Sequence, residues 1–389
     1  MKRDLTLSEE IAGSSAWFVD TTLRDGEQSA GLTLSPAERC QIARKLRETG
    51  VRELEVGIPA SGDEAIARIN QVRDAVPEAW LLAWCRARRE DIAAARSCAV
   101  DGVNLSFPLS DCHLRIWGKS REWVLRTLAD LSEEAASHFS YVAIGGQDAS
   151  RADPVFLSEF CHAVAELPVM RLRLADTVGI LTPDRTARMV QLAASALRGK
   201  PIEIHAHNDL GMATANTIAA WQAGAKCLST TINGVGERAG NAAFEEVVMG
   251  LHAALEVDAG IRRHELVPLC RMLETFAKRS VPPTKPVSGR EIHVHESGLH
   301  ILGLQREVLS YQAYSAEETG CAETFLIGPQ TGPRAVARVL GLDDTDAARV
   351  YPTLCAVSSL LGRSLTIGEA LSFLAISDSG QAAAPALSR

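Results

Sequence analysis

The segment AWFVDTTLRDGEQ, residues 16–28, decides between the two folds that this sequence could adopt. Its first seven residues form a β-rich run, and a polar loop follows. An open doubly wound sheet normally has a glycine-rich phosphate loop after its first strand. That place holds TTLRDGEQ instead. The segment therefore favours a (β/α)8 barrel, in which functional residues follow the strands at one mouth.

Seven more β-rich runs follow, and a helical pattern separates each from the next. In the pattern at 35–50, Ser35 can cap a helix, Pro36 suits its first position and Gly50 suits its end. Strands that alternate with helices pair in parallel, and eight such units in about 240 residues match the size of a TIM barrel. The expected strands are residues 16–22, 51–59, 79–85, 102–108, 139–146, 169–177, 202–208 and 227–234.

The chain divides into four expected parts. Residues 1–15 are polar and are expected to be frayed or a short appendage, and residues 16–280 form the catalytic barrel. The proline-rich stretch SVPPTKPVSG (280–289) is typical of a linker. Residues 281–376 are mostly helical in pattern, and the low-complexity end, 377–389, is predicted to be disordered.

The composition excludes several classes of partner. The 389 residues include 40 Lys and Arg against 48 Asp and Glu, a net charge of −8, so no basic surface for nucleic acid or an anionic membrane is expected. Apolar runs are too short to span a bilayer, and no signal peptide is evident at the start. Nine scattered cysteines without a C-x-x-C motif indicate reduced thiols. We expect a cytoplasmic protein.

Polar residues gather where the mouth of the barrel is expected, whereas the strand interiors are expected to be apolar. In IEIHAHND (202–209), His205 and His207 are two residues apart and therefore point to the same side of a strand. Two converging imidazoles suit a divalent metal, although they could also be packed polar residues that bind water. Asp25 is the expected oxygen ligand and Asn241 a fourth ligand. The ligand types suggest Mg²⁺, Mn²⁺ or Zn²⁺.

Arg24 places a cation beside this predicted metal site. One interpretation is a structural salt bridge to Glu55 or Glu237. The other is that its rigid fork of donors holds a substrate carboxylate or stabilises an oxyanion.

With these residues in view, the sequence resembles the metal-dependent Claisen-condensing acyltransferases that include 2-isopropylmalate and homocitrate synthases. Further stretches resemble the homocitrate synthases of nitrogen fixation within that family, namely VGIPASG (56–62), WCRAR (84–88), SDCHLR (110–115) and DASRADP (148–154). The family motifs are DTTLRDGEQ (20–28), LADTVG (174–179), HAHND (205–209), NGVGERAGN (233–241) and HESGLH (295–300).

The resemblance implies an enzyme that condenses acetyl-CoA with 2-oxoglutarate and water to give homocitrate and CoA. It assigns the metal to Asp25, His205, His207 and Asn241. It places Arg24 and Thr177 on the 2-oxo acid, and Gln28 and Glu55 at polar positions of the site. His300 and Tyr311 match the catalytic histidine and tyrosine of the family. Because that histidine usually comes from the partner subunit, a homodimer is expected.

Two positions depart from the family pattern. Lysine-pathway homocitrate synthases carry R-F-S-S-E-D where this chain has residues 143–148, so the arginine is Ala143 and the catalytic glutamate is Gln147. A glutamine cannot transfer protons, so Gln147 either only hydrogen-bonds or turnover is slow. The distal carboxylate of 2-oxoglutarate must be held elsewhere, and Arg86 or Arg115 is our hypothesis.

Three alternatives remain from the sequence. The same chemistry could use 2-oxoisovalerate or pyruvate, as in 2-isopropylmalate and citramalate synthases. A metal-dependent aldolase or lyase on the same barrel would need neither His300 nor Tyr311. A non-catalytic binding protein would have no reason to keep all the mouth motifs.

Overall fold

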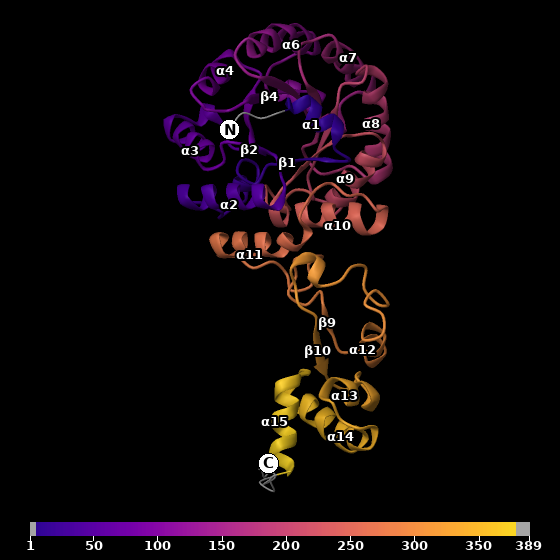
Figure 1. The fold of residues 1–389 in the computed structure, drawn as a ribbon. Helices are drawn as coiled ribbons and strands as arrows, with labels where there is room; N and C mark the ends of the chain where they lie inside the picture. The colour runs from indigo at the N-terminus through magenta and orange to yellow at the C-terminus, as the bar shows by residue number, and fades with distance from the viewer. Residues whose placement is uncertain (1–4, 379–389) are drawn as a thin grey trace. The chain divides into compact units, whose positions relative to one another are not determined.

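Strand β1 hydrogen-bonds to β2 on one side and to β8 on the other, so that eight parallel strands close into a barrel (Figure 1). The structure is a computed structural model and describes residues 5–378. The predicted TIM barrel is confirmed, and every strand lies within one residue of its expected run. The strands are Trp17–Asp20 (β1), Glu53–Glu55 (β2), Trp80–Arg86 (β3), Gly102–Pro108 (β4), Tyr141–Gln147 (β5), Arg171–Asp176 (β6), Ile202–Ala206 (β7) and Cys227–Thr230 (β8).

Helices link successive strands and surround the barrel (Figure 1). Helix α2 begins and ends as predicted: Ser35 and Glu38 form a capping box, Pro36 is the first residue, and Gly50 ends the helix with a φ of 114°. The helices of this unit are Leu7–Gly13 (α1), Pro36–Thr49 (α2), Asp63–Ala75 (α3), Arg89–Ala95 (α4), Asp111–Ile116 (α5), Arg121–Ala136 (α6), Pro154–Ala165 (α7), Pro183–Ala196 (α8), Ala213–Gln222 (α9), Phe244–Leu255 (α10) and Leu266–Ala277 (α11).

Helix α1 agrees with the second of the two expectations for the N-terminal segment, since it is a short packed appendage and is not frayed. Thr6 and Glu9 form a capping box at its start. Leu7 and Ile11 are buried in a cluster that also contains Trp17 of β1. Burial of two aliphatic side chains stabilises the helix against the barrel, so this short segment is ordered by tertiary packing.

The barrel interior also differs from the expectation of apolar strand interiors. Glu53, Arg171 and Glu203 are fully buried, although they come from the middle or the start of strands β2, β6 and β7. Such charges are tolerated inside a protein only when they are paired. These residues pair with one another, as described below.

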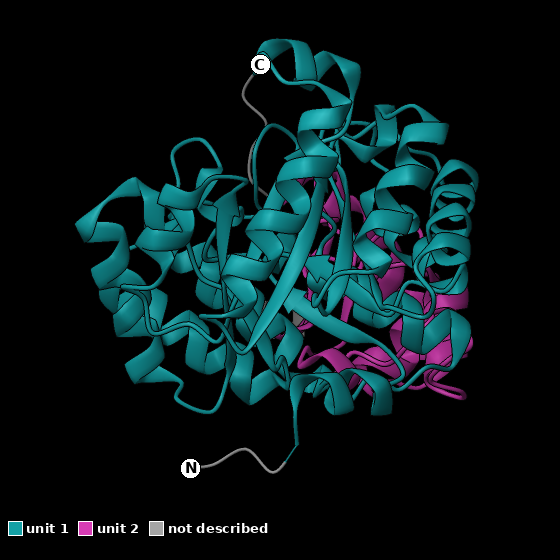
Figure 2. Ribbon diagram, turned by 90° about the horizontal axis from the view of Figure 1, so that it is seen from above, with its two compact units in different colours: residues 1–281 teal, residues 282–389 magenta. Residues whose placement is uncertain are grey.

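The chain divides into two compact units, residues 1–281 and 282–389, whereas the sequence placed the boundary after residue 280 (Figure 2). The second unit is mostly helical, but it also contains a three-stranded sheet that the sequence did not predict. Its elements are Val294–His295 (β9), Gly298–Leu304 (α12), Thr324–Ile327 (β10), Pro333–Leu340 (α13), Asp344–Leu361 (α14), Leu365–Thr366 (β11) and Ile367–Asp378 (α15).

Of the tail predicted to be disordered, residues 377 and 378 end helix α15, and the rest lies outside the described residues. None of the nine cysteines, all of which lie within the described residues, forms a disulfide. Within residues 5–378, no helix combines the length and apolar character that a bilayer crossing requires.

Candidate active site

A pocket of about 210 Å³ opens at the carboxyl ends of the barrel strands. Its size and the many polar residues that line it suit a small acid. The described residues that line it are Arg24, Asp25, Gln28, Ile58, Trp84, Asn104, Ser106, Gly145, Gly146, Gln147, Arg173, Ala175, Thr177, His205, His207, Glu237 and Arg238.

Three buried side chains in this pocket form a candidate metal centre. The Nε2 atoms of His205 and His207 lie 3.2 Å and 3.1 Å from Oδ2 of Asp25. Ligands about 2.1 Å from one ion and at right angles to each other would be about 3.0 Å apart. Among the described residues, this is the one cluster of its kind whose donor atoms converge closely enough to share an ion.

Hydrogen bonds behind the two histidines aim their Nε2 atoms into the pocket. Nδ1 of His207 lies 2.8 Å from the Thr177 carbonyl, and Nδ1 of His205 lies 2.7 Å from the Ser229 hydroxyl. A carbonyl only accepts, so neutral His207 carries its proton on Nδ1 and presents the Nε2 lone pair to Asp25. A lone pair and a carboxylate oxygen facing each other repel unless a cation lies between them. The donor set therefore fits a bound metal.

The ionisation of these ligands also favours a cation. Burial opposes ionisation of Asp25, but the Arg24 guanidinium and the two histidines together outweigh burial and hold the pKa of the carboxyl well below its usual range. Burial lowers the pKa of His205, which keeps its imidazole neutral at pH 7. A carboxylate and a neutral imidazole are the forms that bind metal.

Asn241, the predicted fourth ligand, lies beside His207. The backbones of the two residues form an isolated antiparallel bridge. The side-chain amide of Asn241 donates to the Val235 carbonyl, while its buried Oδ1 has no hydrogen-bond partner. An unpaired buried oxygen next to the cluster fits a metal ligand.

Arg24 forms the salt bridge to Glu55 that the sequence suggested as one possibility, and it also pairs with Asp25. Its Nε is 2.5 Å from Oε1 of Glu55, and its Nη1 is 2.6 Å from Oδ1 of Asp25. The guanidinium is nevertheless part of the pocket wall. Glu55 itself is fully buried and acts through Arg24.

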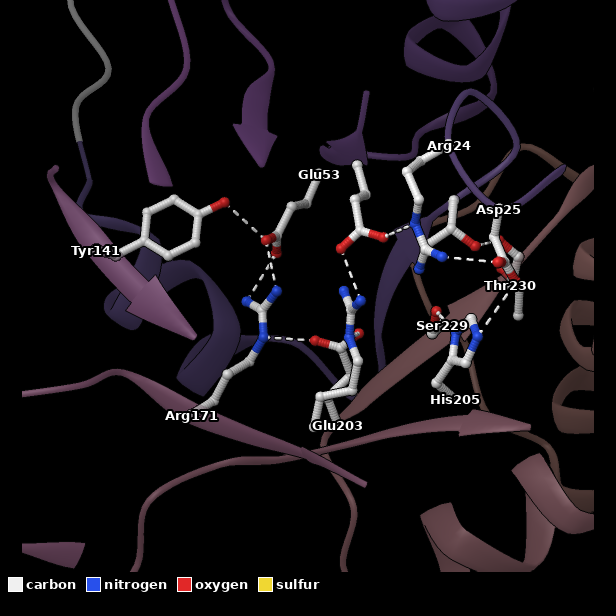
Figure 3. A network of polar contacts seen from close by, with 12 residues as sticks. Arg24, Asp25, Glu53, Tyr141, Arg171, Glu203, His205, Ser229 and Thr230 are labelled. Atoms are coloured by element: carbon white, nitrogen blue, oxygen red, sulfur yellow. Dashed lines mark hydrogen bonds and ion pairs between the residues drawn. The ribbon is translucent and has the colours of Figure 1, made fainter. Parts of the chain in front are cut away.

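Glu55 also pairs with Arg173, and this pair joins a chain of ion pairs inside the barrel, whose members Glu53, Arg171 and Glu203 are labelled in Figure 3. Arg173 Nη1 is 2.6 Å from Glu55, and Arg173 Nε is 2.5 Å from Glu203. Arg171 then lies 2.6 Å from both Glu203 and Glu53.

The far end of this chain is Glu53, and the near end is Asp25 of the candidate metal centre. Glu53 accepts hydrogen bonds from Tyr141 Oη and Trp17 Nε1. From Glu53 to Asp25 the chain holds four carboxylates and three guanidinium groups, an excess of one negative charge. That excess favours a cation at Asp25.

Three more predicted substrate or catalytic residues line the same pocket, namely Gln28, Thr177 and Gln147. The Thr177 hydroxyl accepts a hydrogen bond from the Asp148 backbone N–H, which leaves its own proton free to donate. Gln147 is the last residue of β5, at the edge of the pocket.

Arg86 and Arg115 lie elsewhere. Arg86 lines an adjoining, mainly apolar hollow of about 300 Å³ and pairs with Asp91 through two hydrogen bonds of its guanidinium. Arg115 is exposed on α5. Ala143, where the family pattern has an arginine, is fully buried in β5.

The predicted catalytic pair His300 and Tyr311 lies in the second unit. Their rings stack with centroids 4.4 Å apart and planes 17° from parallel. The structure thus brings together two residues that the sequence places eleven positions apart.

Two pocket residues, Asn104 and Arg173, are not among those predicted from the sequence. Both stand in strands with strict alternation: in RLRLAD (171–176) and GVNLSFP (102–108) the leucine, valine and phenylalanine positions face one side. The opposite, barrel-facing side carries the polar residues. This alternation is the signal that could have identified them.

Comparisons with known proteins agree with the geometry. The sequence model of the HMGL-like family matches residues 16–273. The chain is 40% identical to the homocitrate synthase of Frankia alni, over 83% of this chain and 92% of that protein. It is 39% identical to 2-isopropylmalate synthase 2 of Caldanaerobacter subterraneus, over 82% and 83%.

Among solved structures, the hydroxymethylglutaryl-CoA lyase of Pseudomonas aeruginosa is similar, with a TM-score of 0.60 and 21% identity over 68% of this chain and 94% of that one. At that identity the likeness concerns the barrel fold alone.

Proposed function

The chain belongs to the HMGL-like family, and on that basis we propose that it is a homocitrate synthase, an acyltransferase that condenses acetyl-CoA with 2-oxoglutarate and water. The observation that carries the proposal is the buried cluster of Asp25, His205 and His207 at the mouth of a barrel that is 40% identical to a homocitrate synthase. Similarity to the synthases of nitrogen fixation leads us to propose a role in nitrogenase cofactor synthesis.

Asp25, His205, His207 and Asn241 would hold a divalent ion, Mg²⁺, Mn²⁺ or Zn²⁺. When bound, the ion supplies Lewis acidity to the keto group of the 2-oxo acid.

The side chains of the pocket have distinct roles in this proposal. Arg24, Thr177 and Gln28 bind and orient the 2-oxo acid. Glu55 fixes the Arg24 guanidinium, so its donors are already positioned when negative charge develops on the former keto oxygen. Gln147 donates or accepts hydrogen bonds at the pocket edge but moves no proton.

His300 takes a proton from the acetyl methyl group, and the resulting carbanion bonds to the keto carbon. Tyr311, stacked on His300, orients the base. Water then adds to the thioester carbonyl, the C–S bond breaks, and CoA leaves with a proton. The proton that His300 took passes to the alkoxide oxygen that was the keto oxygen, so the products are homocitrate and CoA.

We further propose a cytoplasmic homodimer in which His300 and Tyr311 serve the barrel of the partner subunit. This proposal rests on the family resemblance of HESGLH (295–300).

The test is CoA release from acetyl-CoA with 2-oxoglutarate, 2-oxoisovalerate or pyruvate, each with and without a chelator. We expect rapid release with 2-oxoglutarate alone, loss of activity on chelation, and recovery with excess divalent ion. Preference for 2-oxoisovalerate would instead assign a 2-isopropylmalate synthase, a possibility that the similarity to the Caldanaerobacter protein raises. CoA release that is unchanged by the chelator would contradict the proposed role of the metal.

A further inference from the structure

The pocket holds polar groups that the metal centre and Arg24 do not use. Asn104 of β4 is 1% exposed, and neither its Oδ1 nor its Nδ2 has a hydrogen-bond partner. Both atoms belong to a residue that lines the pocket. Leaving a buried amide unpaired is costly, so such a group is explained when a ligand satisfies it.

Arg173 of β6 offers a second unused donor at the same wall. Its Nε bonds to Glu203, and its Nη1 lies close to Glu55 without the alignment of a hydrogen bond. Its Nη2 has no hydrogen-bond partner. The two carboxylates hold the guanidinium in place, so this donor is positioned before any ligand arrives.

The neighbouring strand makes room for these two side chains. Ala143 of β5 is in register with Asn104, and Gly145 is in register with Arg173. A Cβ on Gly145 would lie 2.9 Å from Nδ2 of Asn104, so only glycine leaves the amide in its present position. The small residues of β5 thus open the wall where the family pattern has an arginine side chain.

We propose that Asn104 and Arg173 form the subsite for the distal carboxylate of the 2-oxo acid. Arg173 would take the place of the arginine that the family pattern has at position 143, where this chain has alanine. The inference rests on the proposed function and deepens it. A distal carboxylate accepts hydrogen bonds from both side chains. A branched apolar acid would leave both donors unpaired, so the subsite selects against it.

The inference replaces the hypothesis that Arg86 or Arg115 holds this carboxylate. Arg86 already pairs with Asp91, and neither arginine is among the described residues that line the pocket.

The test compares 2-oxoglutarate with 2-oxopentanoate, which has a methyl group in place of the distal carboxylate. Asn104→Leu keeps the approximate volume of the side chain and removes the amide. We expect kcat/KM for 2-oxoglutarate to fall on the order of 10- to 100-fold, with a much smaller change for 2-oxopentanoate. Asn216→Leu is the matched control, because Asn216 is also a buried asparagine but does not line the pocket. It should leave the ratio of the two kcat/KM values unchanged.

Equal losses for both acids, or no loss, would overturn the subsite while leaving the proposed function intact. Wild-type protein that does not turn over 2-oxoglutarate would overturn both. If Asn104→Leu does not fold, Gly145→Ala makes the same test, because its new methyl group displaces the Asn104 amide. The same selective loss is then expected.

Discussion

Each proposed metal ligand depends on a neighbour that fixes its orientation, and for His205 that neighbour is the Ser229 hydroxyl at 2.7 Å. Such partners set the direction in which the imidazole presents its free nitrogen. Substitution of a residue that orients a ligand, such as Ser229, should therefore weaken metal binding even though the ligand itself is unchanged.

We predict that Ser229→Ala weakens metal binding by about 10- to 100-fold, because His205 loses the group that orients it. Calorimetric titration of the apoprotein with Mn²⁺ measures this directly. Ser195→Ala, which changes an exposed helix serine, is the control and should bind normally. Unchanged affinity in Ser229→Ala would mean that the serine does not support the ligand.

A second residue, Asp20, controls how stability depends on pH. It is buried at the end of β1, where its carboxylate accepts hydrogen bonds from Thr22 N and Oγ1. Burial raises the pKa of Asp20 to about 7. The folded state therefore binds more protons than the unfolded chain between about pH 4 and pH 7, and this contribution to stability is lost as the pH rises through that window.

In the Asp20→Asn variant the side chain at position 20 is uncharged at every pH, so this loss of stability should not occur. We expect its stability relative to wild type to increase by about 2 kcal/mol between pH 5 and pH 8. Urea unfolding at several pH values measures the difference. A difference that is constant with pH, or that shrinks as the pH rises, would refute the assignment.

At the scale of elements, strands β2, β6 and β7 are tied together inside the barrel by Glu53, Arg171, Glu203 and Arg173 (Figure 3). Removing one member of a buried ion chain leaves its partners uncompensated. The effect should be largest for Glu203, because its carboxylate pairs with both Arg171 and Arg173.

Glu203→Gln should destabilise the protein by about 3–5 kcal/mol, since two buried guanidinium groups lose a shared carboxylate. Chemical denaturation followed by circular dichroism measures this change in the free energy of unfolding. Glu166→Gln breaks the exposed pair with Arg198 and should cost no more than about 1 kcal/mol. Equal small effects in both variants would show that the interior chain is not a stabilising unit.

The elements also show what the sequence could and could not reveal. Alternating β and helical patterns located the eight strands, and the spacing of His205 and His207 correctly placed both imidazoles together with Asp25. The buried charges of β2, β6 and β7 were missed, because a charge inside a barrel is stable only through partners on other strands. Likewise, the anchoring of α1 depends on Leu7 and Ile11 meeting barrel side chains that are distant in sequence.

At the scale of the whole molecule, the proposed catalytic groups come from two units of the chain. The metal ligands belong to residues 1–281, whereas His300 and Tyr311 belong to residues 282–389. If a site is completed across subunits, as we propose, two inactive variants can restore each other.

We predict that His205→Ala and His300→Ala are each inactive, and that mixing them after reversible dissociation recovers about a quarter of wild-type activity, because half the dimers are mixed and each mixed dimer has one intact site. The His205→Ala protein mixed with itself is the control. No recovery, with subunit exchange verified by mass, would contradict completion of the site across subunits.

We propose that this pocket condenses acetyl-CoA with an acid that carries a distal carboxylate. The most direct measurement is a competition assay. Equal concentrations of 2-oxoglutarate and 2-oxoisovalerate compete for limiting acetyl-CoA in the presence of Mn²⁺, and mass spectrometry quantifies the two products. The account predicts that homocitrate exceeds 2-isopropylmalate by at least about 100-fold, the discrimination expected when a buried hydrogen-bonding site meets an apolar analogue. A mixture dominated by 2-isopropylmalate, or one that contains neither product, would contradict it.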